Sequence, residues 1–134
     1  FSDGTIDEVL LPREGLVTLP PSSTPIDVER ACADTGFSRF PITDSTGDLT
    51  GYLHIKDVLE TDDTSRREII ADKWIRPLAT VAVGSGLYEA LRTMQSRGSH
   101  MARVADESGA VLGVIMLEDV LEELVGEIRS AERA

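Results

Sequence analysis

The chain has 134 residues, of which 41% are hydrophobic and 28% are charged, and its formal net charge is −11. This length and composition suit a globular fold with a real core and argue against a disordered chain. The acidic balance disfavours nucleic acid and anionic lipid as partners, because both need clustered Lys and Arg. It leaves room for a phosphorylated small ligand, since a helix N-terminus or a single Arg can hold a phosphate locally.

The N-terminal residues 1–15 predict a lead-in helix that connects to an upstream domain. Ile6, Val9, Leu10 and Leu11 supply its apolar residues. The chain starts with Phe1, which suggests a piece of a longer protein. No run of apolar residues approaches the roughly 20 that a membrane-spanning helix needs.

Residues 16–60 predict a first unit with the order β-α-β-β-α. An extended segment at 16–19 precedes a helix that begins after Thr24, with Pro25 in its first turn, and ends at Gly36. Two short strands at 40–43 and 49–53 flank a turn and indicate a β-hairpin. A second helix is expected at about 55–60. The single cysteine, Cys32, excludes an intramolecular disulfide and is expected to be a small core residue.

The same order of elements is expected again after a linker at 61–78, in which Trp74-Ile75 should anchor the chain to the core. The second unit spans 79–128, with a strand at 80–83, a helix from Ser85 to Gly98, a hairpin of strands at 101–105 and 111–115, and a closing helix at 117–125. Residues 129–134 are expected to form a tail beyond this helix.

These two units are copies of one sequence. Residues 17–60 align without a gap with residues 79–122, an offset of 79 − 17 = 62, and 11 of the 44 pairs are identical. The identical pairs include turn residues, such as Gly47 and Gly109, and the start of the closing helix, where Asp57-Val58-Leu59-Glu60 matches Asp119-Val120-Leu121-Glu122. An internal duplication of this kind predicts an α+β fold of two β-α-β-β-α units with pseudo-twofold symmetry and a cleft between the halves.

The repeated Asp, Asp57 in one copy and Asp119 in the other, falls in the first turn of a helix that follows a strand. Such a position suits an anion or the diol of a ribose, because helix N-termini carry free N–H groups and acidic residues hold ribose hydroxyls in dinucleotide sites. The structural alternative is that each Asp only complements the helix dipole, which is worth about 0.3–1 kcal/mol.

At this point the sequence resembles a tandem pair of cystathionine-β-synthase (CBS) domains, a Bateman module. Gly51-Tyr52-Leu53-His54-Ile55-Lys56-Asp57-Val58-Leu59 and the run from Leu117 to Ile128 narrow the resemblance to the CorC/HlyC/CNNM group, the haemolysin-like proteins linked to efflux of Mg²⁺ and other divalent cations. The Pro12-Arg13 pair also matches that group. The resemblance implies a module on the cytoplasmic side of the plasma (inner) membrane that follows a transmembrane domain, binds adenosine nucleotides and forms homodimers.

The resemblance also implies a set of nucleotide-binding residues in each copy, at the entry strand, at the first hairpin strand and at a Thr/Ser-x-x-Asp motif. The implied residues are Val17, Thr18, Phe40, Pro41, His54 and Asp57 in the first copy, and Thr80, Val81, Met101, Ala102, Arg103, Met116 and Asp119 in the second. His54 and Met116 stand where the motif has a hydroxyl. Methionine provides no hydroxyl, and losing a hydrogen bond to a charged phosphate removes roughly 1.5–3 kcal/mol.

Two functions follow from this reading. The first is a regulatory module that senses ATP, ADP or AMP, with or without Mg²⁺, and regulates an attached membrane transporter of divalent cations. The second is a dimerisation or interaction module that has lost its ligand, which Met116 and Arg103 favour. No tightly bound cofactor is expected.

An enzyme is disfavoured, because no Ser-His-Asp, Cys-His or phosphate-loop pattern is present and no catalytic residue is expected. No metal site is expected either. Glu122, Glu123 and Glu127 are interpreted as a solvated acidic helix face, with no compact ligand pattern converging on them.

Overall fold

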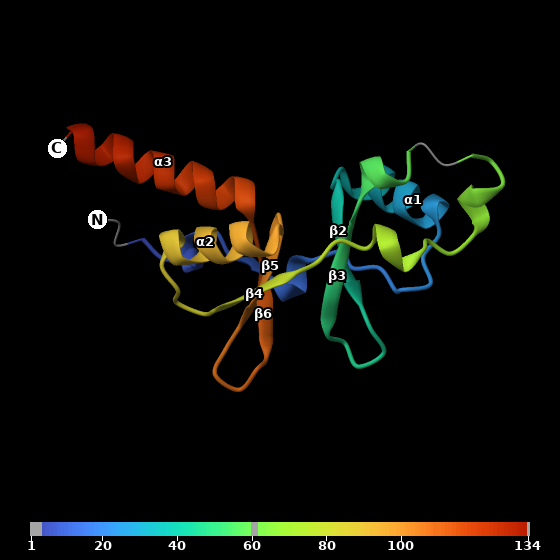
Figure 1. Cartoon of the computed structure of the whole chain (residues 1–134), viewed down its shortest axis with the longest axis horizontal. Helices are drawn as coiled ribbons and strands as arrows, with labels where there is room; N and C mark the ends of the chain where they lie inside the picture. Colours follow the sequence, from blue (N-terminus) through green and yellow to red (C-terminus); the bar gives the residue numbers. More distant parts are fainter. Residues whose placement is uncertain (1–3, 60–61, 134) are drawn as a thin grey trace. The chain divides into compact units, whose positions relative to one another are not determined.

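The computed structural model describes residues 4–59 and 62–133, and the chain forms two compact units. One unit comprises Leu16–Pro77, and the other joins Phe1–Gly15 to Leu78–Ala134. The described helices and strands make an α+β fold (Figure 1). None of the helices in the described part of the chain is both long and apolar enough to cross a membrane.

The unit Leu16–Pro77 holds the first copy of the repeat. Helix α1 (Pro25–Thr35) begins and ends as the sequence predicts: Thr24 and Asp27 form a reciprocal capping box, and Gly36 ends the helix with a φ of 76°. Strands β2 (Arg39–Thr43) and β3 (Leu49–His54) pair antiparallel. Their inward side chains meet α1 in a core of Val28, Phe40, Ile42, Leu53, Val58 and Ile70. Cys32 packs at the edge of this core, as expected.

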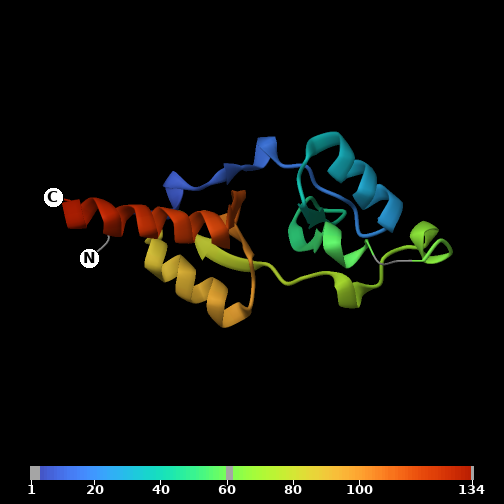
Figure 2. The ribbon, with the colours of Figure 1, turned by 90° about the horizontal axis from the view of Figure 1, so that it is seen from above.

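The other unit holds the second copy. Its four-stranded sheet has the order β1-β6-β5-β4, formed by β1 (Leu11–Pro12), β6 (Val111–Met116), β5 (Met101–Ala105) and β4 (Ala79–Ala82). Helices α2 (Leu87–Arg97) and α3 (Leu117–Arg133) both lie on one side of this sheet (Figures 1 and 2). The core between them is built from buried residues that include Ile6, Leu87, Met94, Val104, Ile115 and Val120.

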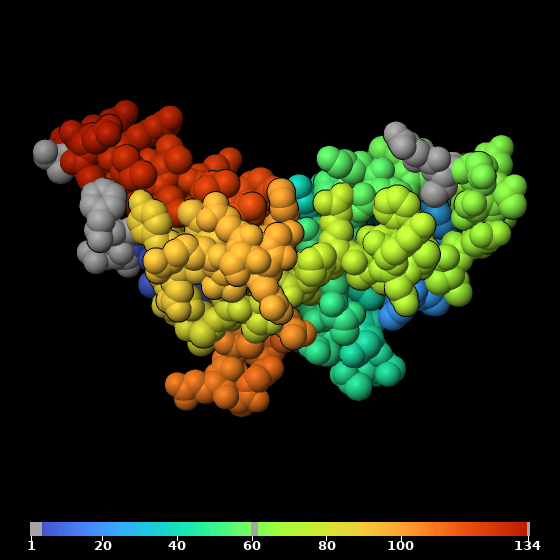
Figure 3. Space-filling view, viewed as in Figure 1, coloured from blue at the N-terminus to red at the C-terminus, as the bar shows by residue number. Residues whose placement is uncertain are grey.

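The hairpin turns show the duplication at atomic detail. In the first copy, Asp44 Oδ1 accepts hydrogen bonds from the backbone and hydroxyl of Thr46 at 2.9 and 2.6 Å. In the second copy, Asp106 Oδ1 accepts the equivalent pair from Ser108 at the same 2.9 and 2.6 Å. These bonds lower the pKa of both carboxyls. Each turn projects from its own unit (Figure 3).

Two predicted helices differ from the structure. The lead-in is not an α-helix over its described residues: it forms a 3-10 turn at Ile6–Glu8, strand β1 and a second 3-10 turn at Arg13–Gly15. Ile6 is fully buried in the core of the second copy, and β1 pairs with β6. Residues 1–3 of that expected helix lie outside the described residues. Over its described residues, 55–59, the expected closing helix of the first copy is only a 3-10 turn, η3 (Ile55–Asp57), whereas its counterpart α3 runs for 17 residues. Residue 60 of that expected helix lies outside the described residues.

The remaining elements agree with the sequence analysis more closely. Helix α2, both hairpins and strand β4 lie within one or two residues of their expected positions. The expected strand at 16–19 is reduced to one bridge between Leu19 and Ile42. In the linker, Ile75 packs on the core as expected, while the Trp74 side chain is 48% exposed.

Candidate functional site

The repeated Asp of the first copy is already engaged within its own unit. Asp57 accepts two hydrogen bonds from the guanidinium of Arg76, from Nε at 2.8 Å and from Nη2 at 2.7 Å. The Asp57 side chain is 11% exposed and that of Arg76 is 35% exposed. The bidentate pair holds the pKa of Asp57 below its usual value and raises that of Arg76. Sequence reasoning missed Arg76, which lies in the linker.

His54 ends strand β3 and caps the 3-10 turn that carries Asp57. Its Nδ1 accepts a hydrogen bond from the backbone N–H of Lys56 at 3.1 Å. Burial and the charges of Arg39 and Arg76 lower the pKa of His54 from its usual value, so the ring is neutral at pH 7. A neutral ring with an accepting Nδ1 keeps its proton on Nε2.

The other residues implied for the first copy have different surroundings. The Phe40 side chain is fully buried in the core, where it offers no surface to a ligand. Val17 packs at the edge of that core, and Thr18 is exposed. Pro41 pairs with Tyr52 and is buried.

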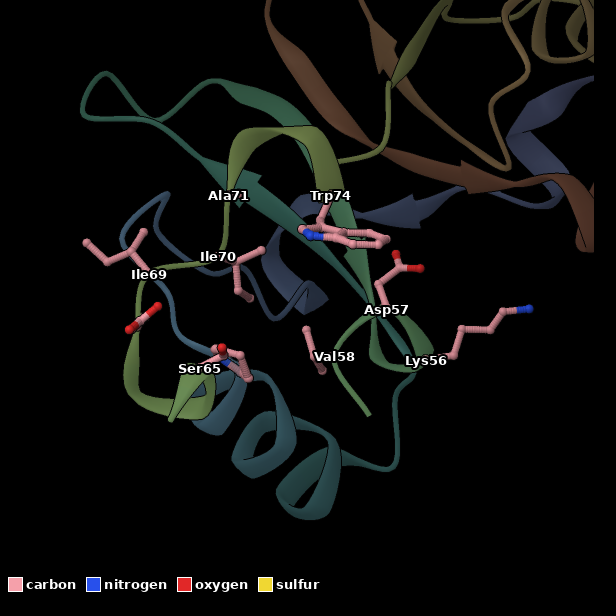
Figure 4. A pocket seen from close by; sticks show the side chains of 10 residues that line it. Lys56, Asp57, Val58, Ser65, Ile69, Ile70, Ala71 and Trp74 are labelled. Carbon is pink, nitrogen blue, oxygen red and sulfur yellow. The ribbon is translucent and has the colours of Figure 1, made fainter. Parts of the chain in front are cut away.

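A groove of about 660 Å³ lies beside Asp57 (Figure 4). The linker forms one wall with Ile69, Ile70 and Trp74, and the 3-10 turn η3 supplies Lys56 and Asp57. In Figure 4 the Trp74 ring lies next to the Asp57 carboxylate. Apart from Asp57, none of the residues implied for nucleotide binding lines this groove, so the groove does not bring the predicted set together.

The repeated Asp of the second copy has a different environment. Asp119 is half-buried in the first turn of α3, where the helix dipole favours negative charge. Within the part of the chain that the structure describes, its carboxylate makes no hydrogen bond or ion pair. It is therefore available to a ligand in a way that Asp57 is not.

The strands of the second copy divide the implied residues between two faces. Thr80 on β4 lies beside Arg103 on β5, and the Arg103 Nε donates to Thr80 Oγ1 at 2.8 Å. Met101 and Met116 pair across β5 and β6. These four share the face opposite the helices, because side chains alternate along a strand. Two further residues, Val81 and Ala102, face the helices within the core.

Three carboxylates that the sequence analysis kept apart meet on the second unit. The lead-in brings Glu8 to Glu123 and Glu127 of α3, and their oxygens lie within 4.8 Å of one another. The expectation that no ligand-like pattern converges at Glu123 and Glu127 is wrong, because the missing member comes from the lead-in. A hydrogen bond with Glu123 raises the pKa of Glu8, so this pair favours sharing a proton over carrying two charges.

Comparison with known proteins identifies the same domain in both repeated units. A family model described as CBS domain matches residues 6–63 and 74–126. An uncharacterized protein of Mycobacterium tuberculosis is 46% identical over 102 residues, which are 76% of this chain and 29% of that protein. The magnesium and cobalt efflux protein CorC of Pasteurella multocida is 34% identical over 128 residues, which are 92% of this chain and 41% of that protein. The chain thus spans less than half the length of either relative.

A solved structure supports the same relationship. The CBS domain of a bacterial CNNM/CorC family Mg²⁺ transporter, in complex with ATP, superposes with a TM-score of 0.78. It is 28% identical in sequence, and the match covers 91% of this chain and 87% of that one. The fold of the chain is therefore that of a paired domain found in transporter proteins.

Proposed function

Because the chain belongs to the CBS domain family and carries one copy in each half, we propose that it is a regulatory module that binds an adenosine nucleotide and controls an attached transporter of divalent cations. The observation that carries the proposal is Asp119, a carboxylate in the first turn of a long helix that has no hydrogen bond or ion pair with any residue that the structure describes. A ribose diol can donate to this carboxylate, and nearby helix N–H groups can face a phosphate. The names of the CorC relative, a magnesium and cobalt efflux protein, and of the ATP-bound neighbour also support a nucleotide-binding module of a cation transporter.

In this role the module works by binding alone and turns over no substrate. A ligand shifts a conformational equilibrium only when it binds one state more tightly than the other. We place the module on the cytoplasmic side of the plasma (inner) membrane, next to the transmembrane part of its parent protein, by analogy with the transporter relatives.

Calorimetric titration tests the proposal directly. Purified chain is titrated with ATP, ADP and AMP, with and without Mg²⁺, beside Asp119→Asn and Met116→Thr. We expect binding to the unaltered chain and its loss in Asp119→Asn. Met116→Thr restores the motif's hydroxyl and should tighten binding by about tenfold or more, because a hydrogen bond to a charged group contributes roughly 1.5–3 kcal/mol. No heat and no thermal shift at millimolar nucleotide would contradict the proposal.

A second candidate function is a homodimerising interaction module without a ligand. Besides Met116, it is favoured by an apolar stripe on α3, where Leu121, Val125 and Ile128 are 42%, 43% and 38% exposed at helical spacing. Light scattering of the unaltered chain and of Leu121→Glu tests this. A dimer that the charge converts to a monomer, in a protein that binds no nucleotide, would favour the second function over the first.

A further inference from the structure

The two repeated carboxylates are not equivalent in the structure. Both oxygens of Asp57 are occupied by Arg76, while Asp119 has no such partner among the residues that the structure describes. Their helices differ too, since Asp57 ends a three-residue 3-10 turn and Asp119 lies in the first turn of a helix of 17 residues. Of these two carboxylates, Asp119 is therefore the one at which an α-helix dipole favours negative charge.

Arg76 is held in place by its own backbone. Its N–H donates to the carbonyl of Tyr52 at 2.8 Å, and its carbonyl accepts from the N–H of Tyr52 at 3.0 Å. The linker at Arg76 thus pairs with β3 as a further, single-residue strand. A Cβ at Gly51 would lie 2.9 Å from the Arg76 carbonyl, so the glycine is what allows this close approach. The guanidinium is therefore anchored by the main chain as well as by Asp57.

The repeat register identifies the residue that occupies the same place in the second copy. Tyr52 corresponds to Val114 through the offset of 114 − 52 = 62, and Val114 pairs with Leu11 of β1. The carbonyl of Leu11 approaches Gly113, just as the carbonyl of Arg76 approaches Gly51. Leu11 is thus the counterpart of Arg76. It carries no charge, so the second copy lacks a guanidinium at this place.

We infer that Arg76 is a built-in occupant of the first-copy position at which a nucleotide would meet Asp57, and that it confines nucleotide binding to one molecule per chain, at the second copy. The inference rests on the proposed function. Ribose hydroxyls are neutral donors, and they would have to replace a bidentate pair between two charged groups, which is the stronger kind of hydrogen bond. At Asp119 no ion pair with a described residue has to be broken first.

The register provides a reciprocal experiment. Arg76→Gln removes the occupant from the first copy, and Leu11→Arg introduces one into the second. The Leu11 side chain is 42% exposed, so an arginine fits there without entering the core. Leu11→Gln is the matched uncharged control, and Arg67→Gln, at an exposed linker arginine, controls for the loss of a positive charge.

The readout is the stoichiometry and affinity of ATP binding by calorimetry, with thermal unfolding of each variant as a check on folding. We expect one ATP per unaltered chain, unchanged binding in Asp57→Asn, and a second binding event in Arg76→Gln. Leu11→Arg should weaken the single event at least tenfold while Leu11→Gln leaves it unchanged. Because Leu11→Arg alters the second unit, it stays informative if Arg76→Gln unfolds the first.

The experiment distinguishes failure of this inference from failure of the proposed function. Loss of the single binding event in Asp57→Asn or in Arg76→Gln, with folding intact, would show that the first copy binds the nucleotide; this overturns the inference and leaves the proposed function standing. Unchanged binding in Leu11→Arg together with one event in Arg76→Gln also overturns it. Absence of binding in the unaltered chain and in every variant would overturn the proposed function itself, and the inference with it.

Discussion

At the scale of single residues, the glycines show most directly how the duplicated sequence serves its fold. Gly51 and Gly113 occupy equivalent repeat positions, and each admits the backbone of another segment. At Gly113 a Cβ would lie 2.1 Å from the Leu11 carbonyl, which is backbone and has no room to rotate away. Glycine recurs at this repeat position because the paired backbone segment leaves no room for a side chain.

Replacing Gly113 with alanine should destabilise the second unit strongly. The added methyl group forces β1 away from β6, and overpacking against backbone costs about 3 kcal/mol or more. The measurement is the free energy of unfolding from urea denaturation. Gly126→Ala is the control with the opposite sign: Gly126 lies inside α3 with nothing within 4 Å of its Cβ position, so alanine should add about 0.5–1 kcal/mol of stability. Equal effects of the two changes would contradict this argument.

The raised pKa of Glu8 leads us to expect that the stability of the folded chain depends on pH. This pKa is raised in the folded chain, so the stability associated with the Glu8 proton is present at low pH and is lost as the pH rises through the folded pKa. Glu8→Gln replaces the ionisable carboxyl with a neutral amide, so the variant does not lose this stability as the pH rises. The variant should therefore melt at a higher temperature than the unaltered chain at about pH 7 and at a similar temperature at about pH 4, where carboxyls are protonated.

Melting curves recorded across this pH range test the effect of Glu8. Glu14→Gln provides the control, because Glu14 is an exposed acid of the same lead-in segment that lies outside the cluster with Glu123 and Glu127. A constant difference between the Glu8→Gln variant and the unaltered chain at every pH would show that the carboxyl pair does not titrate as described.

At the scale of elements, helix α1 depends on a cap that the sequence already indicates. The Thr24 hydroxyl accepts from the N–H of Asp27 at 3.3 Å, and the Asp27 carboxylate accepts from the N–H of Thr24 at 2.9 Å. Thr24→Ala removes one of these bonds and should cost about 1 kcal/mol of unfolding free energy. Thr64→Ala is the control, since Thr64 begins a 3-10 turn without a side-chain cap. A cost at Thr64 as large as that at Thr24 would argue against capping as the cause.

The closing helices of the two copies diverge although their starts are almost identical. Both copies read Asp-Val-Leu-Glu, yet η3 ends after three residues and α3 continues for 17. The later residues account for this difference. Helix α3 continues through Leu124, which is buried in the core, whereas in the first copy the linker supplies Ile70 to the core. Each sheet face is therefore covered, but by different segments of the chain.

At the scale of the whole molecule, the lead-in is part of the second copy's unit, although the first copy follows it in the sequence. Ile6 is fully buried there, and its N–H donates to the carbonyl of Ser85 at 2.9 Å. The N–H of Leu87 in turn donates to the carbonyl of Gly4 at 3.1 Å. The N-terminal segment is thus tied to the unit that carries Asp119.

Truncation of Ile6 should therefore loosen the second copy and spare the first. Ile6→Ala creates a cavity in the core and should cost about 2–5 kcal/mol. Hydrogen exchange is expected to accelerate at amides of α2, β5 and β6 and to stay unchanged in α1, β2 and β3. Leu11→Ala, at an exposed side chain of the same segment, should have little effect. Faster exchange in α1 after Ile6→Ala would contradict the assignment of the lead-in to the second unit.

The sequence by itself determined the duplication, the helices α1 and α2, both hairpins and the α+β class. These features are local: Pro25 and Gly36 bound one helix, and Asp-x-Ser/Thr-Gly sets each turn within a few residues. The repeated Asp also stood out, since two copies of one motif are visible without any structure.

Only the tertiary structure decided which partners these residues meet. Arg76 pairs with Asp57 across 19 residues, and Glu8 meets Glu123 and Glu127 from the other end of the chain. Both contacts involve segments outside the repeat. The linker pairs with a strand of the first copy, and the lead-in packs on a helix of the second. Periodicity reports which face of an element is apolar, but it does not specify which distant segment joins the edge of a sheet. For this reason two identical motifs came to hold two different carboxylate environments.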